Sequence, residues 1–299
     1  MENGVQALME YFPSEVKNKI MGCNLDELEE IRLRTNRNIF LKLGQEEKKV
    51  EHIITTQELL EILQRVCDNS IYTYQSQICN GYITVKGGHR VGITGNVVLK
   101  DGQVINISHI YSLNFRIARQ VIGCSKKVLP YILNIPDNSI YNTVILSPPG
   151  RGKTTLLRDS IRSISSGIPE YGFRGLNVGV VDERGEIAAM YKGVPQNDLG
   201  DRADILDNVS KALGMRMLVR SMSPRVIVAD EIGTSEDVEA INYAVCSGVK
   251  GLFSAHGSSL NDIVQSPILG RLYEMGLIER IILIENNRSI SLVYEKNNK

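Results

Sequence analysis

The spacing of apolar residues divides the chain into two parts with different patterns. In the first part, helical and strand-like periods are mixed. The helix-like segments are residues 5–20, residues 25–31 and a segment that begins at a capping-box pattern, Thr55 followed by Glu58, and runs to about Cys67. The strand-like segments are residues 30–34, residues 39–43 after a turn at 36–38, and two or three glycine-punctuated stretches between 70 and 120. This mixture predicts a small α+β domain at residues 1–125.

From residue 126 onward, strands and helices alternate. The expected strands are residues 143–146, 177–181, 225–229, 251–255, 280–285 and 289–294. The expected helices are one that follows the first strand and two at about residues 205–221 and 236–246. Such alternation predicts a largely parallel sheet with helices on both faces. Residues 126–299 are therefore expected to form an α/β domain, with the boundary near Gly123–Pro130.

The strongest chemical signal lies between the strand at 143–146 and the helix that follows it. Its residues are Ser147-Pro148-Pro149-Gly150-Arg151-Gly152-Lys153-Thr154-Thr155. A strand, a glycine-rich turn and a helix are the context of a phosphate-binding P-loop, in which backbone N–H groups and the helix N-terminus hold the anion. Lys153 would face the β- and γ-phosphates, and Thr154 would offer its hydroxyl to Mg²⁺. Ser147 replaces the first glycine of the pattern, which predicts a slightly strained or reshaped beginning of the loop.

Two further strands end in carboxylates. Asp230 and Glu231 follow the strand at 225–229, where the first acid would orient Mg²⁺ and the second would polarise the attacking water. Asp182 to Glu186 follow the strand at 177–181, so Glu183 or Glu186 is a candidate catalytic acid; the alternative is a salt-bridged loop that involves Arg184.

A histidine and several arginines complete the candidate site. His256 ends the strand at 251–255, where a γ-phosphate sensor would lie, although a lone histidine is more often structural. An arginine from a neighbouring subunit can stabilise transition-state charge in phosphoryl transfer. The candidates are Arg90, Arg116 and Arg119 in the first part, and Arg216 and Arg220 on one helix face. For any single one of them, a structural ion pair is the alternative.

Composition and charge exclude several classes of protein. The formal net charge is zero, with no basic stripe, so a nucleic-acid partner is not expected. The five cysteines contain no C-x-x-C pair, which disfavours a zinc site and fits a reducing cytoplasm. No signal peptide and no membrane-spanning apolar run is visible. Any membrane contact is therefore expected through a partner, without direct insertion.

These motifs together resemble the secretion-type RecA-like P-loop ATPases, the motors of type II and type IV secretion and of pili. The resemblance equates the glycine-rich segment, the two acid-ended strands and Ser254-Ala255-His256-Gly257 with the Walker A segment, the Asp box, Walker B and the His box. By its position in the Asp box, Glu186 is the better match to the catalytic acid of that superfamily, with Glu183 next.

A more specific resemblance is to the stage III sporulation protein AA family. It is carried by six segments: Glu30–Arg34, Gly88–Gly95, Leu113–Arg119, Val181–Arg184, Arg202–Asp207 and Met215–Pro224. The resemblance implies a RecA-like P-loop domain after a smaller α+β domain, and Mg²⁺-dependent ATP hydrolysis in an endospore-forming bacterium. It also implies a homo-oligomer, as a hexamer, at the mother-cell cytoplasmic face of the mother cell–forespore channel, with membrane-embedded channel proteins as partners.

Two other functions stay open at this point. One is a nucleotide-gated assembly scaffold with little hydrolysis, favoured by Ser147 and by the lack of a substrate-binding signature. The other is a RecA-like ATPase that acts on RNA or DNA, which the balanced charge and the lack of aromatic-plus-basic stripes disfavour.

Overall fold

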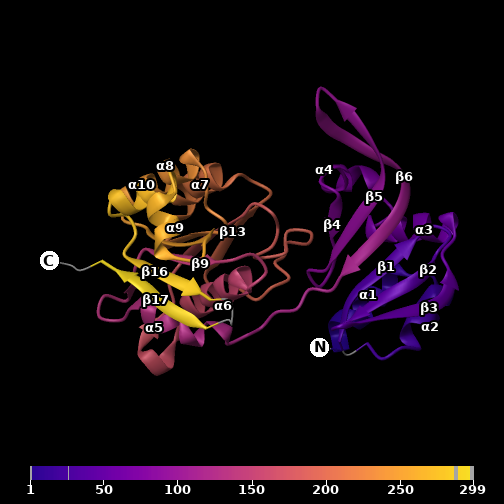
Figure 1. Ribbon diagram of the computed structural model, residues 1–299, viewed down its shortest axis with the longest axis horizontal. Coiled ribbons are helices and arrows are strands. Elements are labelled where there is room, and N and C mark those ends of the chain that lie inside the picture. Colours follow the sequence, from indigo (N-terminus) through magenta and orange to yellow (C-terminus); the bar gives the residue numbers. More distant parts are fainter. Residues whose placement is uncertain (1, 26, 286–288, 297–299) are drawn as a thin grey trace. The chain divides into compact units, whose positions relative to one another are not determined.

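The computed structural model describes residues 2–25, 27–285 and 289–296, and the chain forms two compact units (Figure 1). The first unit contains the chain up to Arg119 together with Ala189–Gln196. The second unit contains Gln120–Ala188 and the chain from Asn197 onward. The chain therefore leaves the second unit after Ala188 and returns to it at Asn197, an excursion that the sequence did not predict.

A six-stranded antiparallel sheet packed with several short helices forms the first unit. The strand order is β3-β2-β1-β6-β5-β4. The strands are β1 (Leu28–Arg34), β2 (Asn38–Leu43), β3 (Glu46–Ile53), β4 (Tyr82–Thr84), β5 (Arg90–Lys100) and β6 (Gln103–Arg116). The helices are α1 (Glu2–Leu8), η1 (Met9–Tyr11), α2 (Ser14–Met21), α3 (Thr56–Val66), η2 (Ile71–Tyr74) and α4 (Gln75–Cys79). Alternate strand residues such as Ile31, Leu33 and Phe115 are buried in the core with Phe12 and Leu59.

Several local predictions in this unit are wrong. The helix expected at 25–31 is absent because β1 already begins at Leu28, where Ile31 and Leu33 bury one face of the strand. The helix expected at 5–20 is divided between α1 and α2, because Pro13 restricts the preceding residue to an extended backbone. The capping box of α3 is confirmed, since Thr55 and Glu58 exchange both of its hydrogen bonds.

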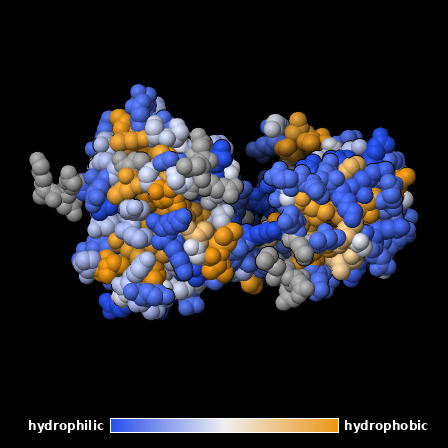
Figure 2. Space-filling view, turned by 60° about the horizontal axis from the view of Figure 1, so that its bottom comes forward, coloured by the Kyte–Doolittle hydropathy of each residue, from blue (hydrophilic) through white to orange (hydrophobic). Residues whose placement is uncertain are grey.

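Strands β5 and β6 continue beyond the sheet as a two-stranded ribbon, seen in Figure 1. Its pairs include Val97 with Ile107 and Leu99 with Val104. Val97 and Leu99 are exposed, as is Ile105. Figure 2 shows that hydrophobic side chains interrupt the hydrophilic surface of both units.

The second unit is built on a seven-stranded sheet with the order β13-β12-β14-β15-β9-β16-β17. Its strands are β9 (Thr143–Ser147), β12 (Val178–Asp182), β13 (Ala203–Asp207), β14 (Val226–Ala229), β15 (Lys250–His256), β16 (Arg280–Ile284) and β17 (Ile290–Glu295). All neighbouring pairs are parallel except β16 with β17. The prediction of a largely parallel sheet is therefore confirmed.

Helices lie on both faces of this sheet. The main ones are α6 (Lys153–Ser166), α7 (Lys211–Met222) and α8 (Ser235–Cys246). Figure 1 shows α7 and α8 on one face and α6 on the other. The shorter elements are η3 (Cys124–Lys127), α5 (Leu129–Ile132), β7 (Leu133–Asn134), β8 (Ser139–Ile140), β10 (Gly167–Ile168), η4 (Pro169–Tyr171), β11 (Phe173–Arg174), α9 (Leu260–Gln265) and α10 (Leu269–Glu274).

The helix expected at 205–221 is a strand followed by a shorter helix. Residues up to Asp207 form the edge strand β13, which pairs with β12, and α7 begins only at Lys211. The period of this segment is ambiguous because an edge strand of five half-buried residues carries no clear alternation. No helix in the described part of the chain is long and apolar enough to span a membrane.

Candidate nucleotide site

The carboxyl ends of the parallel strands meet at one edge of the sheet, and the glycine-rich loop of residues 147–155 lies there. Gly150 and Gly152 have φ values of 72° and 90°, in the left-handed region that glycine adopts most easily. No atom lies within 4 Å of the position that a Cβ would take at either glycine, so this side of the loop is open. Ser147 stays in strand conformation, paired with His256, and its hydroxyl donates to the Pro148 carbonyl at 2.8 Å. Ser147 is not among the residues with a left-handed backbone, so the strain expected there is not observed.

Lys153 begins α6 and is almost completely buried, with 6% of its surface exposed. Its Nζ lies 3.4 Å from Nδ1 of His256 and 3.9 Å from Oε1 of Glu231. Burial lowers the pKa of the Lys153 ammonium, and the charges of Asp230 and Glu231 offset this only in part. An ammonium group held in such surroundings gains stability when an anion binds beside it.

Thr154 and Asp230 lie 76 residues apart in the sequence and are brought together by the fold. The Thr154 hydroxyl donates to Oδ2 of Asp230 at 2.6 Å, and the Ser254 hydroxyl donates to Oδ1. A hydroxyl beside a carboxylate is an all-oxygen donor set, which suits a hard cation such as Mg²⁺. The residues present therefore fit the metal that the sequence predicted at Thr154 and Asp230.

Glu231 has a left-handed backbone. Its φ is 55°, a left-handed conformation that costs a non-glycine residue about 1–3 kcal/mol. The Glu231 amide donates to the Ser254 hydroxyl at 2.9 Å, which fixes this turn. Its carboxylate lies 2.6 Å from Nη1 of Arg184 and 3.2 Å from Nε2 of His256. His256 thus contacts both Lys153 and Glu231. This position suits a residue that couples the two side chains.

The loop after β12 adds the second group of acids. Asp182 is buried and accepts hydrogen bonds from the amides of Glu186, Ile187 and Ala188 at 2.8–3.1 Å. On the other side, the Arg158 guanidinium donates to the carbonyls of Glu186 and Ile187. The backbone at Glu186 is therefore fixed from both sides.

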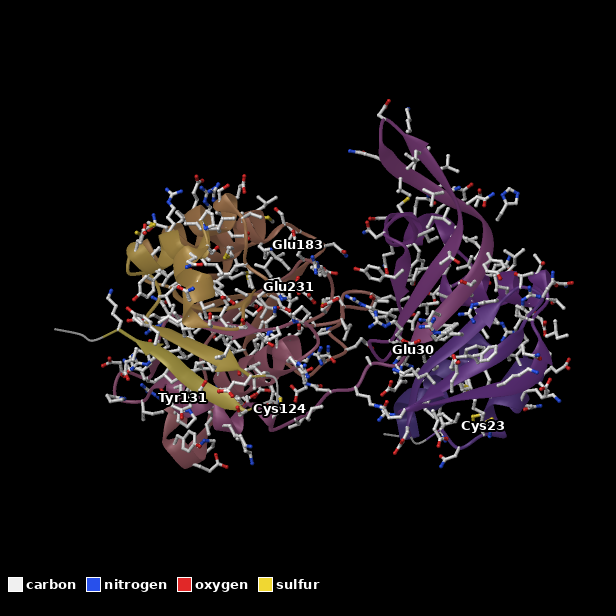
Figure 3. The ribbon with its side chains drawn as sticks, viewed as in Figure 1. Cys23, Glu30, Cys124, Tyr131, Glu183 and Glu231 are labelled. Atoms are coloured by element: carbon white, nitrogen blue, oxygen red, sulfur yellow. The ribbon has the colours of Figure 1, made fainter. Side chains whose placement is uncertain are left out.

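The two acidic strand ends form one site. Glu183 pairs with Lys211 at 2.6 Å, and both line a cavity of about 20 Å³. The other lining residues are Arg184, Glu186, Asp230 and Glu231. Figure 3 shows Glu183 and Glu231 at the same end of the sheet.

Sequence reasoning missed the roles of Asp182, Arg158, Lys211 and Ser254. Arg158 and Lys211 lie in no motif, and Asp182 and Ser254 lie in motifs that assigned them no role of their own. Each of the four acts by holding the backbone or a carboxylate of another residue. Arg184 was considered only as part of a salt-bridged loop, and its partner proves to be a candidate catalytic acid on another strand.

The arginines proposed to act across a subunit boundary have partners within their own units. Arg116 ends β6 opposite Glu30. Burial would raise the pKa of the Glu30 carboxyl, but Arg32, Asn114 and then the charge of Arg116 lower it. Arg119 donates to the Leu28 carbonyl at 3.1 Å, and Arg90 lies over the ring of Tyr82. The remaining two are Arg216, which pairs with Glu239, and Arg220, which lies over the ring of Tyr243.

A parallel sheet with a glycine-rich loop after one strand and acids after two others defines a RecA-like ATPase fold. Two solved structures share it. The ATPase DotB of Legionella pneumophila aligns with a TM-score of 0.61 and 16% identity over 94% of this chain and 79% of DotB. The pilus retraction motor PilT, solved with bound ADP, aligns with a TM-score of 0.63 and 15% identity over 95% of this chain and 82% of PilT. The predicted fold class is confirmed.

The chain belongs to the family described as sporulation stage III, protein AA, which residues 14–298 match. The stage III sporulation protein AA of Bacillus subtilis (strain 168) is 38% identical to it over 295 residues. This alignment covers 97% of this chain and 94% of the Bacillus protein. The family predicted from the sequence is confirmed.

Proposed function

We propose that this protein is a Mg²⁺-dependent ATPase that energises or assembles the channel between mother cell and forespore during endospore formation. The observation that carries the proposal is the convergence of Lys153, Thr154, Asp230 and Glu231 at one sheet edge. Membership of a sporulation family and a fold shared with ATPases support it. Its place would be the cytoplasmic, mother-cell side of the membrane, reached through partner proteins.

The glycine-rich loop and Lys153 would hold the phosphates. The N–H groups of residues 150–152 precede α6 and those of residues 153–155 form its first turn, where the helix dipole favours an anion. The residues from Ser147 to Thr155 would be the nucleotide-binding segment. Lys153 already lacks full solvation and would pair with the β/γ-phosphates. Thr154 and Asp230 would hold Mg²⁺, which neutralises charge on the phosphates when bound.

Glu231 and Glu186 are the acids that we assign to the attacking water. Glu231 follows β14 directly, and Glu186 is fixed by Asp182 and Arg158 on the adjacent loop. Glu183, the second candidate by its position in the Asp box, lies on the same loop, and its carboxylate pairs with Lys211 at 2.6 Å. His256 contacts both Lys153 and Glu231, which suits a residue that reports the state of the phosphates to the acid.

The active form would be a homo-oligomer, and we propose a hexamer. In it, Arg116 or Arg119 from the first unit of a neighbouring subunit would complete the site and stabilise charge in the transition state. Membrane-embedded channel proteins would be the partners that use the conformational work.

A second function, a nucleotide-gated scaffold, is favoured by one contact. Arg184 holds the Glu231 carboxylate at 2.6 Å, and an acid engaged in this way is not available to polarise water. In that case ATP would bind and order an assembly while hydrolysis stayed slow.

Ring formation separates the two functions. We would compare wild type, Glu231→Gln and the surface control Lys126→Ala by sedimentation with Mg-ATP, and test each for sporulation in cells. A motor predicts that Glu231→Gln assembles but does not sporulate. A scaffold predicts that the same variant assembles and sporulates like wild type.

A further inference from the structure

Three arginines gather at the amino-terminal ends of the parallel strands in the second unit. The glycine-rich loop lies at the opposite, carboxyl ends of these strands. In the parallel pairing, Val178 is in register with both Ala203 and Val226, so the residues before them, Arg202 and Arg225, flank Asn177. Neighbouring strands are about 4.8 Å apart, which places the backbones of these two arginines about 10 Å apart. Arg174, at the end of β11, is the third.

These arginines line two adjoining pockets. The larger has a volume of about 670 Å³, and its lining includes Arg174, Arg202 and the glycines at 167, 172 and 175. The smaller, of about 300 Å³, also contains Arg174 and Arg202 and adds Arg225. Together they have the size of a small-ligand site.

The positive charges in this arginine pocket are not neutralised. Among the described residues, no carboxylate lies within salt-bridge distance of the three guanidinium groups. Asp137 lines the smaller pocket, and its carboxylate accepts a hydrogen bond from the side-chain amide of Asn134 at 2.8 Å. Because the chain as a whole has no net charge, this local excess is a property of the pocket.

Arg202 is held in place for binding. Its Nη1 donates to the Ser165 carbonyl at 3.0 Å, and its amide donates to the Ser165 hydroxyl at 2.6 Å. A Cβ at Gly175 would collide with the same Nη1, so glycine is needed for this approach. An arginine fixed in this way loses less side-chain entropy when it binds an anion.

We propose that the arginine pocket binds a small ligand that carries two or more phosphate groups. Guanidinium groups bind phosphate oxygens through paired N–H donors. Because three guanidinium groups line the arginine pocket, they can contact more than one phosphate group. A nucleic acid is a poorer fit, because it would need a basic stripe that continues beyond the pocket. The site lies at the opposite ends of the strands from Lys153, and the proposal does not depend on ATP hydrolysis.

Hydrogen–deuterium exchange with inorganic tripolyphosphate locates the binding. We expect tripolyphosphate to slow exchange in residues 166–175 and 202–203, in addition to any protection at residues 148–156. In Lys153→Ala, the slower exchange at residues 166–175 and 202–203 should remain, whereas any protection at residues 148–156 should be lost. Protection confined to residues 148–156 in the wild-type protein would overturn the proposal.

Variants test the arginines themselves. Arg225→Ala and Arg174→Ala should each weaken tripolyphosphate binding at the pocket by roughly tenfold, because each removes a charged donor. Arg271→Ala is the matched control, since it removes an exposed arginine on α10. An equal loss in Arg271→Ala would overturn the proposal by showing general charge attraction.

A carboxylate probe distinguishes the alternative occupant. Hexaglutamate carries a comparable charge on a peptide chain and tests whether the pocket is a docking site for an acidic protein segment. We expect it to displace tripolyphosphate only at a concentration at least tenfold higher. Tighter binding of hexaglutamate than of tripolyphosphate would overturn the assignment to a phosphate ligand.

Discussion

Nη1 of Arg184 lies 2.6 Å from Oε2 of Glu231, so the loop after β12 restrains the acid that follows β14. The arginine side chain is 66% exposed, whereas the glutamate side chain is 25% exposed. Such a partly solvated pair is worth about 1 kcal/mol or less, which is weak enough to break in a working cycle. We interpret it as a restraint on Glu231.

Arg184→Ala is therefore expected to raise basal ATP hydrolysis. Removing a restraint of about 1 kcal/mol frees Glu231 and corresponds to at most about a fivefold gain in rate. Steady-state turnover with Mg-ATP, with Arg271→Ala as control, measures it. A tenfold or greater fall would instead mean that Arg184 acts on the phosphates.

Glu186→Gln and Glu183→Gln should have unequal effects. A general base contributes about 10²–10⁴-fold, so we expect Glu186→Gln to lower turnover by at least 100-fold with ATP affinity retained. Glu183→Gln removes a partner of Lys211 and should change turnover less than tenfold. Turnover and nucleotide affinity are measured for both variants. The reverse order of effects would assign the catalytic role to Glu183.

The excursion of residues 189–196 is predicted to depend on Asp68. This carboxylate accepts from the Tyr74 hydroxyl and pairs with Lys192 at 2.9 Å, and these contacts lower its pKa against the effect of burial. Gln196 adds a hydrogen bond to the Gly87 amide at 2.8 Å. In Asp68→Asn we expect faster hydrogen exchange and proteolysis at residues 189–196.

The control for this prediction is Asp101→Asn, which changes an exposed carboxylate at the tip of the β5–β6 ribbon. Equal exchange in both variants and wild type would mean that residues 189–196 are held without the Asp68 contacts.

Stability at low pH should depend on Asp159, which is 1% exposed on α6. Burial would raise the pKa of its carboxyl, but hydrogen bonds from Ser125, Gly123 and Arg162 lower it below the ordinary value of 3.8. Because the folded-state pKa is lowered, the stabilisation is complete above the unfolded pKa and is lost as pH falls through the folded pKa.

Asp159→Asn is expected to cost about 3–5 kcal/mol at pH 7, because it leaves the surrounding donors partly unpaired. The difference in the free energy of unfolding between Asp159→Asn and wild type should become smaller below about pH 4. Urea unfolding from pH 7 to pH 2.5 measures both effects, with the exposed Asp201→Asn as control. A difference that stays constant over this range would contradict the role of the charged carboxylate.

The sequence predicted the parallel sheet and the conjunction of Lys153, Thr154 and Asp230 because these follow from strand periodicity and from residues at strand ends. It could not predict what holds them. Asp182 acts through three backbone amides, and Arg158 reaches the same loop from α6. The Arg158 contacts depend on tertiary packing, and the Asp182 contacts depend on the conformation of the loop that follows it, so neither set follows from helix or strand periodicity.

The errors in secondary structure have the same origin. Residues 203–207 form an edge strand because β12 offers a free edge, although their own period is ambiguous. Residues 25–31 looked helical in isolation, but pairing of β1 with β2 and β6 overrode this tendency.

The central claim is most directly tested by the ATP hydrolysis rate as a function of protein concentration, with Mg²⁺, in wild type and Lys153→Ala. The account predicts turnover that requires Lys153 and rises per subunit with concentration, since a neighbouring subunit completes the site. Equal hydrolysis by Lys153→Ala and wild type would contradict the account.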